Sequence, residues 1–254
     1  MPTSHPIALV TGGSRGLGKS TALHLARLGH DVILTYMTQQ TQAEAVVADI
    51  EAMGQKAVAM ALNLSDSRSF AGFATQVSAA LQTHWAQTTF NVLVNNAGTG
   101  SHASLMDTTE AQFDEMVNVH LKGPLFLTQK LLPLMADGGR IVNLSSGLTR
   151  FALPGFAAYA AVKGAVEVLS RYMAKELGPR GIAVNTVAPG AIATDFGGGA
   201  VRDNPQLHDF IASQTALGRV GEADDIGAMV ASLATSDNRW INAQRIEVSG
   251  GMFI

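Results

Sequence analysis

The chain contains no cysteine, and this absence excludes several kinds of chemistry at once. Without thiol groups the chain cannot form a disulfide, a thiolate zinc site, an iron–sulfur cluster held by cysteines or a cysteine nucleophile. At 254 residues the chain is long enough to bury a core without a covalent or metal crosslink. We therefore expect no metal centre and expect any catalysis to use oxygen and nitrogen groups.

A large charge of one sign is also missing. The 17 Lys and Arg residues and the 20 Asp and Glu residues give a formal net charge of −3. Nucleic-acid binding is not expected, because it needs a basic excess to neutralise phosphates. The uncharged stretches are broken before about 18 apolar residues accumulate, the length of a membrane helix. Residues 1–6 have no basic and apolar regions typical of a secretory signal. We expect a cytoplasmic globular protein with no membrane partner.

Glycine, in contrast, is abundant, with 26 of 254 residues. Short apolar runs alternate with longer amphipathic runs, a pattern typical of a parallel sheet with crossover helices. We predict one α/β domain over 1–254, a Rossmann-type doubly wound parallel sheet of about seven strands with helices on both faces. The predicted strands are 7–10, 32–36, 57–62, 91–94, 140–144, 183–187 and 245–248, and the predicted helical stretches are 17–28, 41–53, 67–81, 110–135, 157–177 and 223–234. The segment 191–218 is predicted to be a mobile substrate loop with a short helix.

Polar residues and glycines follow most of the predicted strands, and ligands of doubly wound sheets bind at these carboxyl ends. The strand at 7–10 leads into a Gly-rich turn at 11–18, which has the spacing G-x-x-x-G-x-G and not G-x-G-x-x-G. Such a turn suits a pyrophosphate resting on the following helix N-terminus. An ordinary tight turn between strand and helix is the alternative.

Tyr159 and Lys163 are four residues apart in the predicted helix 157–177, so they are neighbours on one face. The other two tyrosines lack a lysine at this spacing. A nearby cation favours the phenolate, so Lys163 is a candidate for lowering the pKa of Tyr159 and making it an acid or base near neutrality. A hydroxyl of Ser145 or Ser146 is a candidate for holding a carbonyl oxygen. The alternative is an ordinary buried tyrosine with a surface lysine.

Together these motifs resemble those of the short-chain dehydrogenase/reductase family over about residues 7–251. The family patterns T-G-x-x-x-G-x-G, N-N-A-G and Y-x-x-x-K are present at 11–18, 95–98 and 159–163. The family's serine lies thirteen residues before the tyrosine, which selects Ser146. The resemblance implies hydride transfer between a nicotinamide and a carbonyl or alcohol carbon. Tyr159 would protonate the carbonyl oxygen, Ser146 would position it, and Lys163 would bind the nicotinamide ribose and lower the pKa of Tyr159.

The resemblance also implies a dinucleotide site along the strand ends. No acid follows the predicted strand 32–36 to bind the ribose of NAD, and Arg15 is placed to pair with the extra phosphate of NADP. We predict NADP(H) as cofactor, with NAD(H) as the alternative. The expected cofactor contacts are Gly12, Ser14, Arg15, Gly16, Leu17, Gly18, Tyr36, Asn63, Leu64, Asn96, Ala97, Gly98, Tyr159, Lys163, Pro189, Gly190, Ile192 and Thr194.

Two residues depart from the family pattern. His120 stands where a catalytic asparagine usually holds a proton-relay water, and Ser249 stands where the family often has aspartate. We predict that His120 is catalytic and anchors the same water through a ring nitrogen. A different relay, or a helix histidine with no catalytic part, is the alternative.

The substrate is the least defined feature. The chain is most similar in style to 3-oxoacyl-carrier-protein reductases and related carbonyl reductases, which implies reduction of a 3-oxoacyl thioester or a small-molecule ketone. An alcohol, sugar or steroid dehydrogenase working oxidatively, or a non-catalytic NADP-sensing protein, is the alternative. The resemblance also implies a homo-oligomer, a tetramer or dimer. The candidate apolar walls of the substrate site are Leu148, Phe151, Leu153, Phe156, Phe196 and Phe210.

Overall fold

A computed structural model describes residues 5–254 and confirms the predicted parallel sheet. Its seven strands are ordered β3-β2-β1-β4-β5-β6-β7, and every neighbouring pair is parallel. The strand order reverses between β1 and β4, and ligands of doubly wound sheets bind at the carboxyl ends of the strands beside such a reversal. The strands are β1 (Ile7–Val10), β2 (Asp31–Tyr36), β3 (Ala57–Ala61), β4 (Phe90–Asn95), β5 (Met135–Leu144), β6 (Ala183–Pro189) and β7 (Arg245–Val248).

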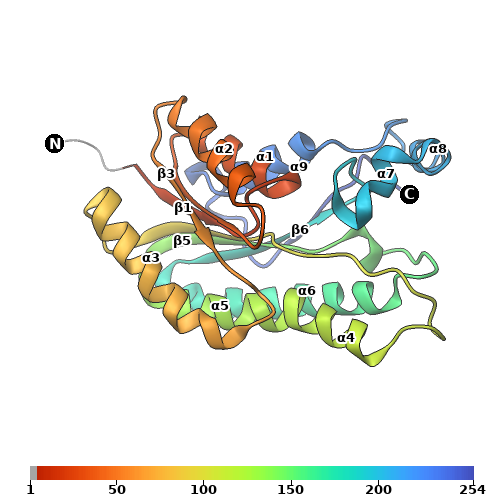
Figure 1. Cartoon of the computed structure of the whole chain (residues 1–254), viewed down its shortest axis with the longest axis horizontal. Helices are drawn as coiled ribbons and strands as arrows, with labels where there is room; N and C mark the ends of the chain where they lie inside the picture. The colour runs from red at the N-terminus through yellow and green to blue at the C-terminus, as the bar shows by residue number, and fades with distance from the viewer. Residues whose placement is uncertain (1–4) are drawn as a thin grey trace.

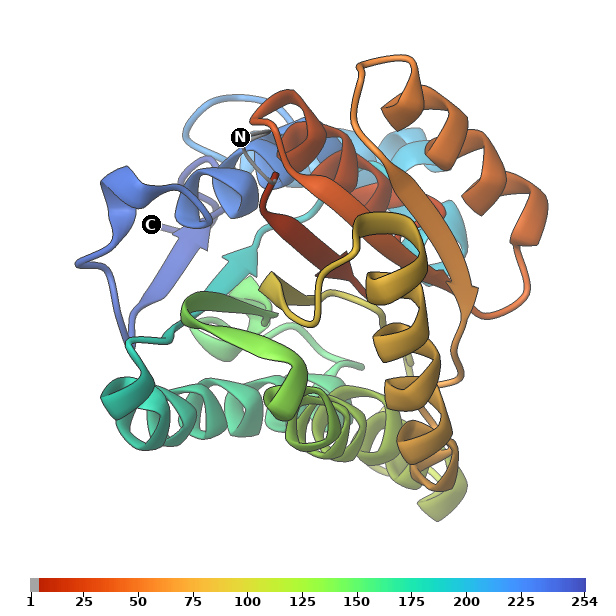
Figure 2. The ribbon, with the colours of Figure 1, turned by 90° about the vertical axis from the view of Figure 1, so that its left-hand side faces the viewer.

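Helices cover both faces of the sheet, so the molecule has three layers (Figures 1 and 2). Helices α1, α2 and α9 lie on one face, and α3, α5 and α6 lie on the other. Within residues 5–254 the structure has no helix both long and apolar enough to cross a membrane. The helices are α1 (Gly16–Arg27), α2 (Gln40–Glu51), α3 (Phe70–Trp85), α4 (Glu110–Val117), α5 (Gly123–Leu131), α6 (Ala157–Leu177), α7 (Ala200–Asp203), α8 (Pro205–Ser213) and α9 (Ala223–Leu233).

The central strand shows why the apolar runs in this sequence are continuous. All four residues of β1 are fully buried. Ala8 and Val10 belong to the apolar cluster under α1 and α9, whereas Ile7 and Leu9 belong to the cluster under α3 and α5. Because successive side chains of a strand point to opposite faces, a sheet covered on both faces needs apolar residues at every position.

The predicted helical stretch 110–135 is wrong as a single helix. Helix α4 passes through a π-helical turn, η2 (Asn118–Lys122), into α5, and a short 3-10 turn, η3 (Leu132–Leu134), follows. Pro124 has no N–H to donate to the preceding turn, and the wide turn lies just before it. Strand β5 also begins earlier than predicted, at Met135, which pairs with Phe90 before the register shifts.

The segment 191–218 contains more helix than predicted. It includes the 3-10 turn η6 (Phe196–Gly199) together with α7 and α8. Three consecutive glycines at 197–199 adopt positive φ, a conformation that other residues rarely adopt. Figure 1 shows α7 and α8 at one end of the sheet, beside the C-terminus. We call residues 191–218 the lid segment.

Candidate active site

The ends of β1 and β4 are joined by side chains of the two predicted motifs. The Thr11 hydroxyl oxygen accepts hydrogen bonds from the N–H groups of Asn96 and Ala97, both at 3.0 Å. The Asn96 side-chain amide donates in return to the carbonyl oxygens of Thr11, at 2.8 Å, and Gly12, at 3.2 Å. Thr11 begins the Gly-rich motif but is not among the site residues predicted from the sequence. These bonds hold the turn at 11–18 against the N-N-A-G segment, as the convergence of strand ends predicts.

The Gly-rich turn is built to receive an anion. A Cβ atom on Gly18 would lie 2.0 Å from the Gly12 carbonyl oxygen, so only glycine lets α1 approach the turn this closely. Gly12 and Gly16 both have positive φ. Within the described part of the chain, no side chain caps the N-terminus of α1, and its first turn has no acidic residue. The free N–H groups and the helix dipole therefore fit a pyrophosphate.

The remaining predicted cofactor residues line the same edge. Ser14 and Leu64 are buried, Leu17 and Tyr36 are half-buried, and Asn63 accepts two hydrogen bonds from Ser65. The segment after β6 also reaches this edge, because a Cβ atom on Gly16 would lie 3.7 Å from Thr194. At its start the Gly190 N–H donates to the Val248 carbonyl at 3.0 Å, and Pro189 and Ile192 lie on either side of this contact in sequence.

Arg15 faces the lid segment. One of its terminal guanidinium nitrogens lies 3.5 Å from an Asp195 carboxylate oxygen. Asp195 also pairs with Arg202 of α7. As the sequence predicts, no acidic residue directly follows β2. The residue there is Met37, and it is exposed. The Arg15 charge is thus available beside the turn, although a phosphate would have to compete with Asp195 for it.

The structure brings Ser146, Tyr159 and Lys163 together. Tyr159 is buried on α6, and the Ser146 hydroxyl lies near enough to the Tyr159 hydroxyl to act on its pKa. The Leu148 N–H donates to the Ser146 hydroxyl oxygen at 3.2 Å, which fixes that oxygen at the end of β5. The Lys163 ammonium nitrogen donates to the Leu144 carbonyl at 2.8 Å and lies 5.7 Å from the centre of the Tyr159 ring.

Burial governs the ionisation of this cluster. Desolvation raises the pKa of Tyr159, and the nearby Ser146 hydroxyl offsets only part of that effect. Desolvation also lowers the pKa of Lys163 to about 7. The sequence predicts that Lys163 lowers the pKa of Tyr159. In the structure, burial has the larger effect and raises the pKa of Tyr159. In the protein alone, Tyr159 is a protonated phenol at neutral pH.

His120 lies in the π-helical turn and is buried beside the same cluster. Its ring meets the Tyr159 ring edge to face, with 5.3 Å between centres, and its Nε2 is 2.7 Å from the Thr99 carbonyl oxygen. Burial, together with the Lys163 charge, lowers the pKa of His120 to about 3, so the ring is neutral. Gly98 makes room for it, because a Cβ atom there would lie 2.5 Å from the ring.

Two buried polar atoms near His120 lack partners within residues 5–254. They are Nδ1 of His120 and the side-chain oxygen of Asn95. Both residues line one small cavity together with Lys163. If Nε2 carries the ring proton that Thr99 accepts, Nδ1 is an acceptor. Because buried polar atoms are usually hydrogen-bonded, two such acceptors beside an ammonium group suit a donor such as water, and the cavity has to widen to admit one.

The apolar residues predicted to surround the substrate do not all lie at one place. Phe196 of the lid segment lies 5.9 Å from the Tyr159 ring, and Leu148 packs against the cluster that contains Tyr159. Phe151 and Phe210 instead pack against Phe253 near the C-terminus. Phe156 meets His102, with 4.9 Å between ring centres. The two residues nearest the reacting groups are thus Phe196 and Leu148.

A family model described as enoyl-(acyl carrier protein) reductase matches residues 12–253. The chain belongs to the short-chain dehydrogenase/reductase family. The 3-oxoacyl-[acyl-carrier-protein] reductase FabG of Staphylococcus aureus is 39% identical over 250 residues, which cover 97% of this chain and 98% of that protein. The promiscuous reductase LugOII, which catalyses keto-reduction at C1 in lugdunomycin biosynthesis, is 41% identical with a TM-score of 0.92, covering 97% of this chain and 96% of its own.

The angucycline C-6 ketoreductase LanV, solved with bound NADP, is 36% identical with a TM-score of 0.93, covering 98% of this chain and 95% of its own. As a member of the short-chain dehydrogenase/reductase family, the chain is an oxidoreductase. The similarity to ketoreductases, one of them with NADP, supports NADP-dependent carbonyl reduction and agrees with the resemblance read from the motifs.

Proposed function

We propose that this short-chain dehydrogenase/reductase reduces a ketone with NADPH, using Tyr159 as proton donor, Ser146 to hold the carbonyl oxygen and Lys163 to bind the nicotinamide ribose. The observation that carries the proposal is the cluster in which the Ser146 hydroxyl acts on that of Tyr159 and the Lys163 ammonium lies 5.7 Å from the Tyr159 ring centre. Two hydroxyls at one point can both donate to a carbonyl oxygen. The similar FabG, LugOII and LanV are named as reductases of carbonyl groups.

The ionisation of Tyr159 favours the reductive direction. Reduction needs a proton at the carbonyl oxygen, and burial keeps Tyr159 protonated by raising its pKa. Lys163 uses one of its three N–H groups on the Leu144 carbonyl and keeps two for ribose hydroxyls. NADPH supplies the hydride when it is bound. The turn at 11–18 then holds the pyrophosphate, and Arg15 pairs with the extra phosphate.

His120 holds the water that returns a proton to the site. Its neutral ring accepts through Nδ1, and the Asn95 side-chain oxygen is a second acceptor lining the same cavity. A water that enters when this cavity widens and donates to both atoms satisfies both acceptors. With a pKa of about 3, His120 serves as an acceptor and does not carry the proton as an imidazolium.

The substrate in this proposal is a ketone with an apolar body. Phe196 and Leu148 lie beside Tyr159, so an apolar group attached to the carbonyl carbon contacts them. Phe196 belongs to the lid segment 191–218, and its side chain is about half exposed, at 47%. Closure of this segment over the substrate removes water from the reacting groups.

We propose that the homo-oligomer implied by the family resemblance is a homotetramer. Helices α4, α5 and α6 carry exposed apolar side chains, which suit a contact with a second copy. They are Phe113, Phe126, Val168 and Tyr172. Light scattering at several protein concentrations tests this proposal, since a monomer at all of them contradicts it. A cytoplasmic location stays a prediction.

The deciding experiment measures NADPH consumption against acyl-thioester, aliphatic, aromatic and sugar ketones in parallel. We expect turnover with at least one apolar ketone and its loss in Tyr159→Phe. Tyr172→Phe is the matched control, because Tyr172 is on the same helix and the variant keeps the aromatic ring assigned to the contact between copies. Tight NADPH binding without turnover of any ketone would refute the proposal and favour a non-catalytic NADP-binding protein.

A further inference from the structure

Glu167 lies on α6 one turn beyond Lys163, and one of its carboxylate oxygens collects three donors. The Ser145 hydroxyl donates to it at 2.6 Å, the Thr149 hydroxyl at 2.7 Å and the Arg245 Nε at 2.8 Å. The Glu167 side chain is 13% exposed and that of Arg245 is 24% exposed. A carboxylate in such a place is costly unless it is paired and hydrogen-bonded, and Glu167 is both.

The donors to Glu167 surround Ser146. Ser145 precedes it, and Thr149 ends the short turn η4 (Gly147–Thr149) that follows it. Arg245 also donates to the Thr149 hydroxyl at 3.0 Å and to the Ser146 carbonyl at 3.4 Å. The backbone on both sides of Ser146 is therefore fixed to α6 and β7, the elements that carry Lys163 and Arg245.

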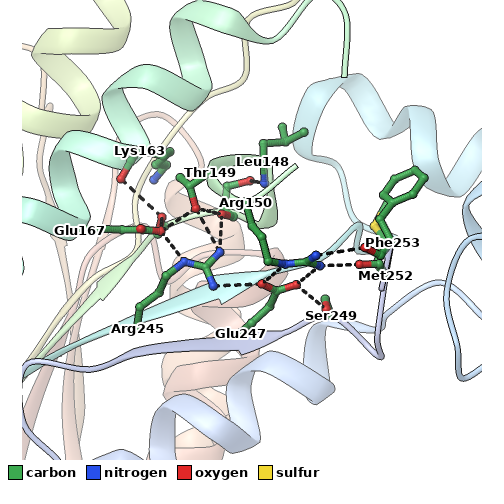
Figure 3. Close-up of polar contacts among 12 residues, drawn as sticks. Leu148, Thr149, Arg150, Lys163, Glu167, Arg245, Glu247, Ser249, Met252 and Phe253 are labelled. Atoms are coloured by element: carbon green, nitrogen blue, oxygen red, sulfur yellow. Dashed lines mark hydrogen bonds and ion pairs between the residues drawn. The ribbon is translucent and has the colours of Figure 1, made fainter. Parts of the chain in front are cut away.

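The network continues through Glu247 to the C-terminal tail (Figure 3). Glu247 accepts from Arg245 at 2.9 Å and from Arg150 at 2.6 Å, and the Ser249 hydroxyl donates to it at 2.9 Å. Arg150 holds the pKa of Glu247 down, to about 2. Ser249 stands where the family often has aspartate, and here Glu247 supplies a carboxylate two residues earlier.

Arg150 links this network to the lid segment. It donates to the backbone carbonyls of Met252, at 2.5 Å, and Phe253, at 3.0 Å. The Phe253 N–H donates in turn to the Gln214 carbonyl at 2.9 Å, just after α8. Met252 is buried against Ile211 of α8. The C-terminal tail thus connects the charged network to the end of α8, which we call the base of the lid segment.

We propose that Glu167, paired with Arg245, is a positioning residue for Ser146, and that Glu247 and Arg150 couple this position to the base of the lid segment. This inference rests on the proposed function, because it assigns Ser146 the task of holding the carbonyl oxygen. Glu167 touches neither substrate nor cofactor in this role. It fixes the backbone from which the Ser146 hydroxyl points, and a small misplacement of such a group is costly to turnover.

The test compares Glu167→Gln with Glu176→Gln, an exposed glutamate on the same helix. The amide of Glu167→Gln keeps the shape but loses the charge that faces Arg245. We expect a fall in kcat of about tenfold to a hundredfold with an unchanged KM for NADPH. Hydrogen exchange of the amides at 147–150 is expected to become faster. Glu176→Gln should match the wild type in all three measurements.

Two further variants keep the test decisive. Arg150→Ala removes the ion pair with Glu247 and the contacts with the tail but leaves the pair of Glu167 and Arg245, so we expect a higher KM for the ketone with kcat largely kept. If Glu167→Gln does not fold, the paired variant Glu167→Gln/Arg245→Gln, which removes both charges, replaces it and is expected to show the same loss of kcat as Arg245→Gln alone.

Three results would overturn the inference. The first is a kcat of Glu167→Gln within twofold of the wild type. The second is a lower kcat of Glu167→Gln with unchanged hydrogen exchange at 147–150. The third is an Arg150→Ala variant with an unchanged KM for the ketone. Absence of ketone turnover in the wild type would refute the proposed function. The exchange measurement would still report whether Glu167 fixes the Ser146 segment.

Discussion

The hydroxyl groups of Ser145 and Ser146 are adjacent in sequence but have different partners. Ser145 donates to the Glu167 carboxylate at 2.6 Å. Ser146 accepts from the Leu148 N–H at 3.2 Å and acts on the pKa of Tyr159. Side chains alternate in direction along an extended backbone, so only one of the two can face the reacting groups. The structure therefore assigns different roles to the two serines, which are equally good candidates when only the residue types are considered.

This difference predicts opposite effects for two alanine variants. Ser146→Ala removes a donor to the carbonyl oxygen, so we expect kcat to fall by about a hundredfold with little change in stability. Ser145→Ala removes a hydrogen bond to a buried carboxylate, and we expect the free energy of unfolding to fall by about 1–3 kcal/mol. Steady-state kinetics and denaturant unfolding distinguish them. A larger loss of kcat in Ser145→Ala would contradict the assignment.

The parallel sheet could be predicted from sequence because its signal is local. Each strand is a short apolar run, and each predicted site motif follows directly after a strand or within one helix. The helix at 157–177 is confirmed at both ends. The stretch 110–135 failed because its apolar spacing continues through the π-helical turn, so periodicity alone does not reveal the interruption.

The charged network around Glu167 could not be predicted, because its partners are far apart in sequence. Glu167 and Arg245 are 78 residues apart, and Arg150 and Glu247 are 97 apart. Neither pair belongs to a motif with fixed spacing. Only the pairing of β6 with β7 and the packing of α6 bring them together. The ionisation of Lys163 was also hidden, since it depends on burial and not on the neighbouring residues in the chain.

The depressed pKa of Lys163 predicts a stability that increases with pH. Its pKa is about 7 in the folded protein and 10.5 as the ordinary value, so between these limits the unfolded chain binds the extra proton. Between these two values the free energy of unfolding should increase by about 1.4 kcal/mol per pH unit because of this group. Below pH 7 the destabilisation by the buried Lys163 charge is complete. Denaturant unfolding from pH 7 to 9 measures this slope. Lys163→Met should flatten it, and equal slopes would contradict the buried charge.

His120 is predicted to act as a neutral acceptor. His120→Ala removes the acceptor, so we expect kcat to fall about tenfold, less than the loss of a direct proton donor would cause. His120→Asn restores the residue usual in the family and is expected to keep most of the turnover. Because the pKa of His120 is about 3, the pH profile of kcat between pH 5 and 9 should contain no inflection from it. Unchanged turnover in His120→Ala would refute the catalytic role.

Arg15 is predicted to set the preference for NADPH. Arg15→Ala removes the cation expected to pair with the extra phosphate, so we expect the KM for NADPH to rise about tenfold, corresponding to about 1.4 kcal/mol, with little change for NADH. Asp195→Asn is the matched control, because it removes the carboxylate 3.5 Å from Arg15 that competes with the phosphate. That variant should bind NADPH more tightly. Measured KM values for both cofactors decide the matter, since comparable values in the wild type would show that Arg15 does not discriminate between them.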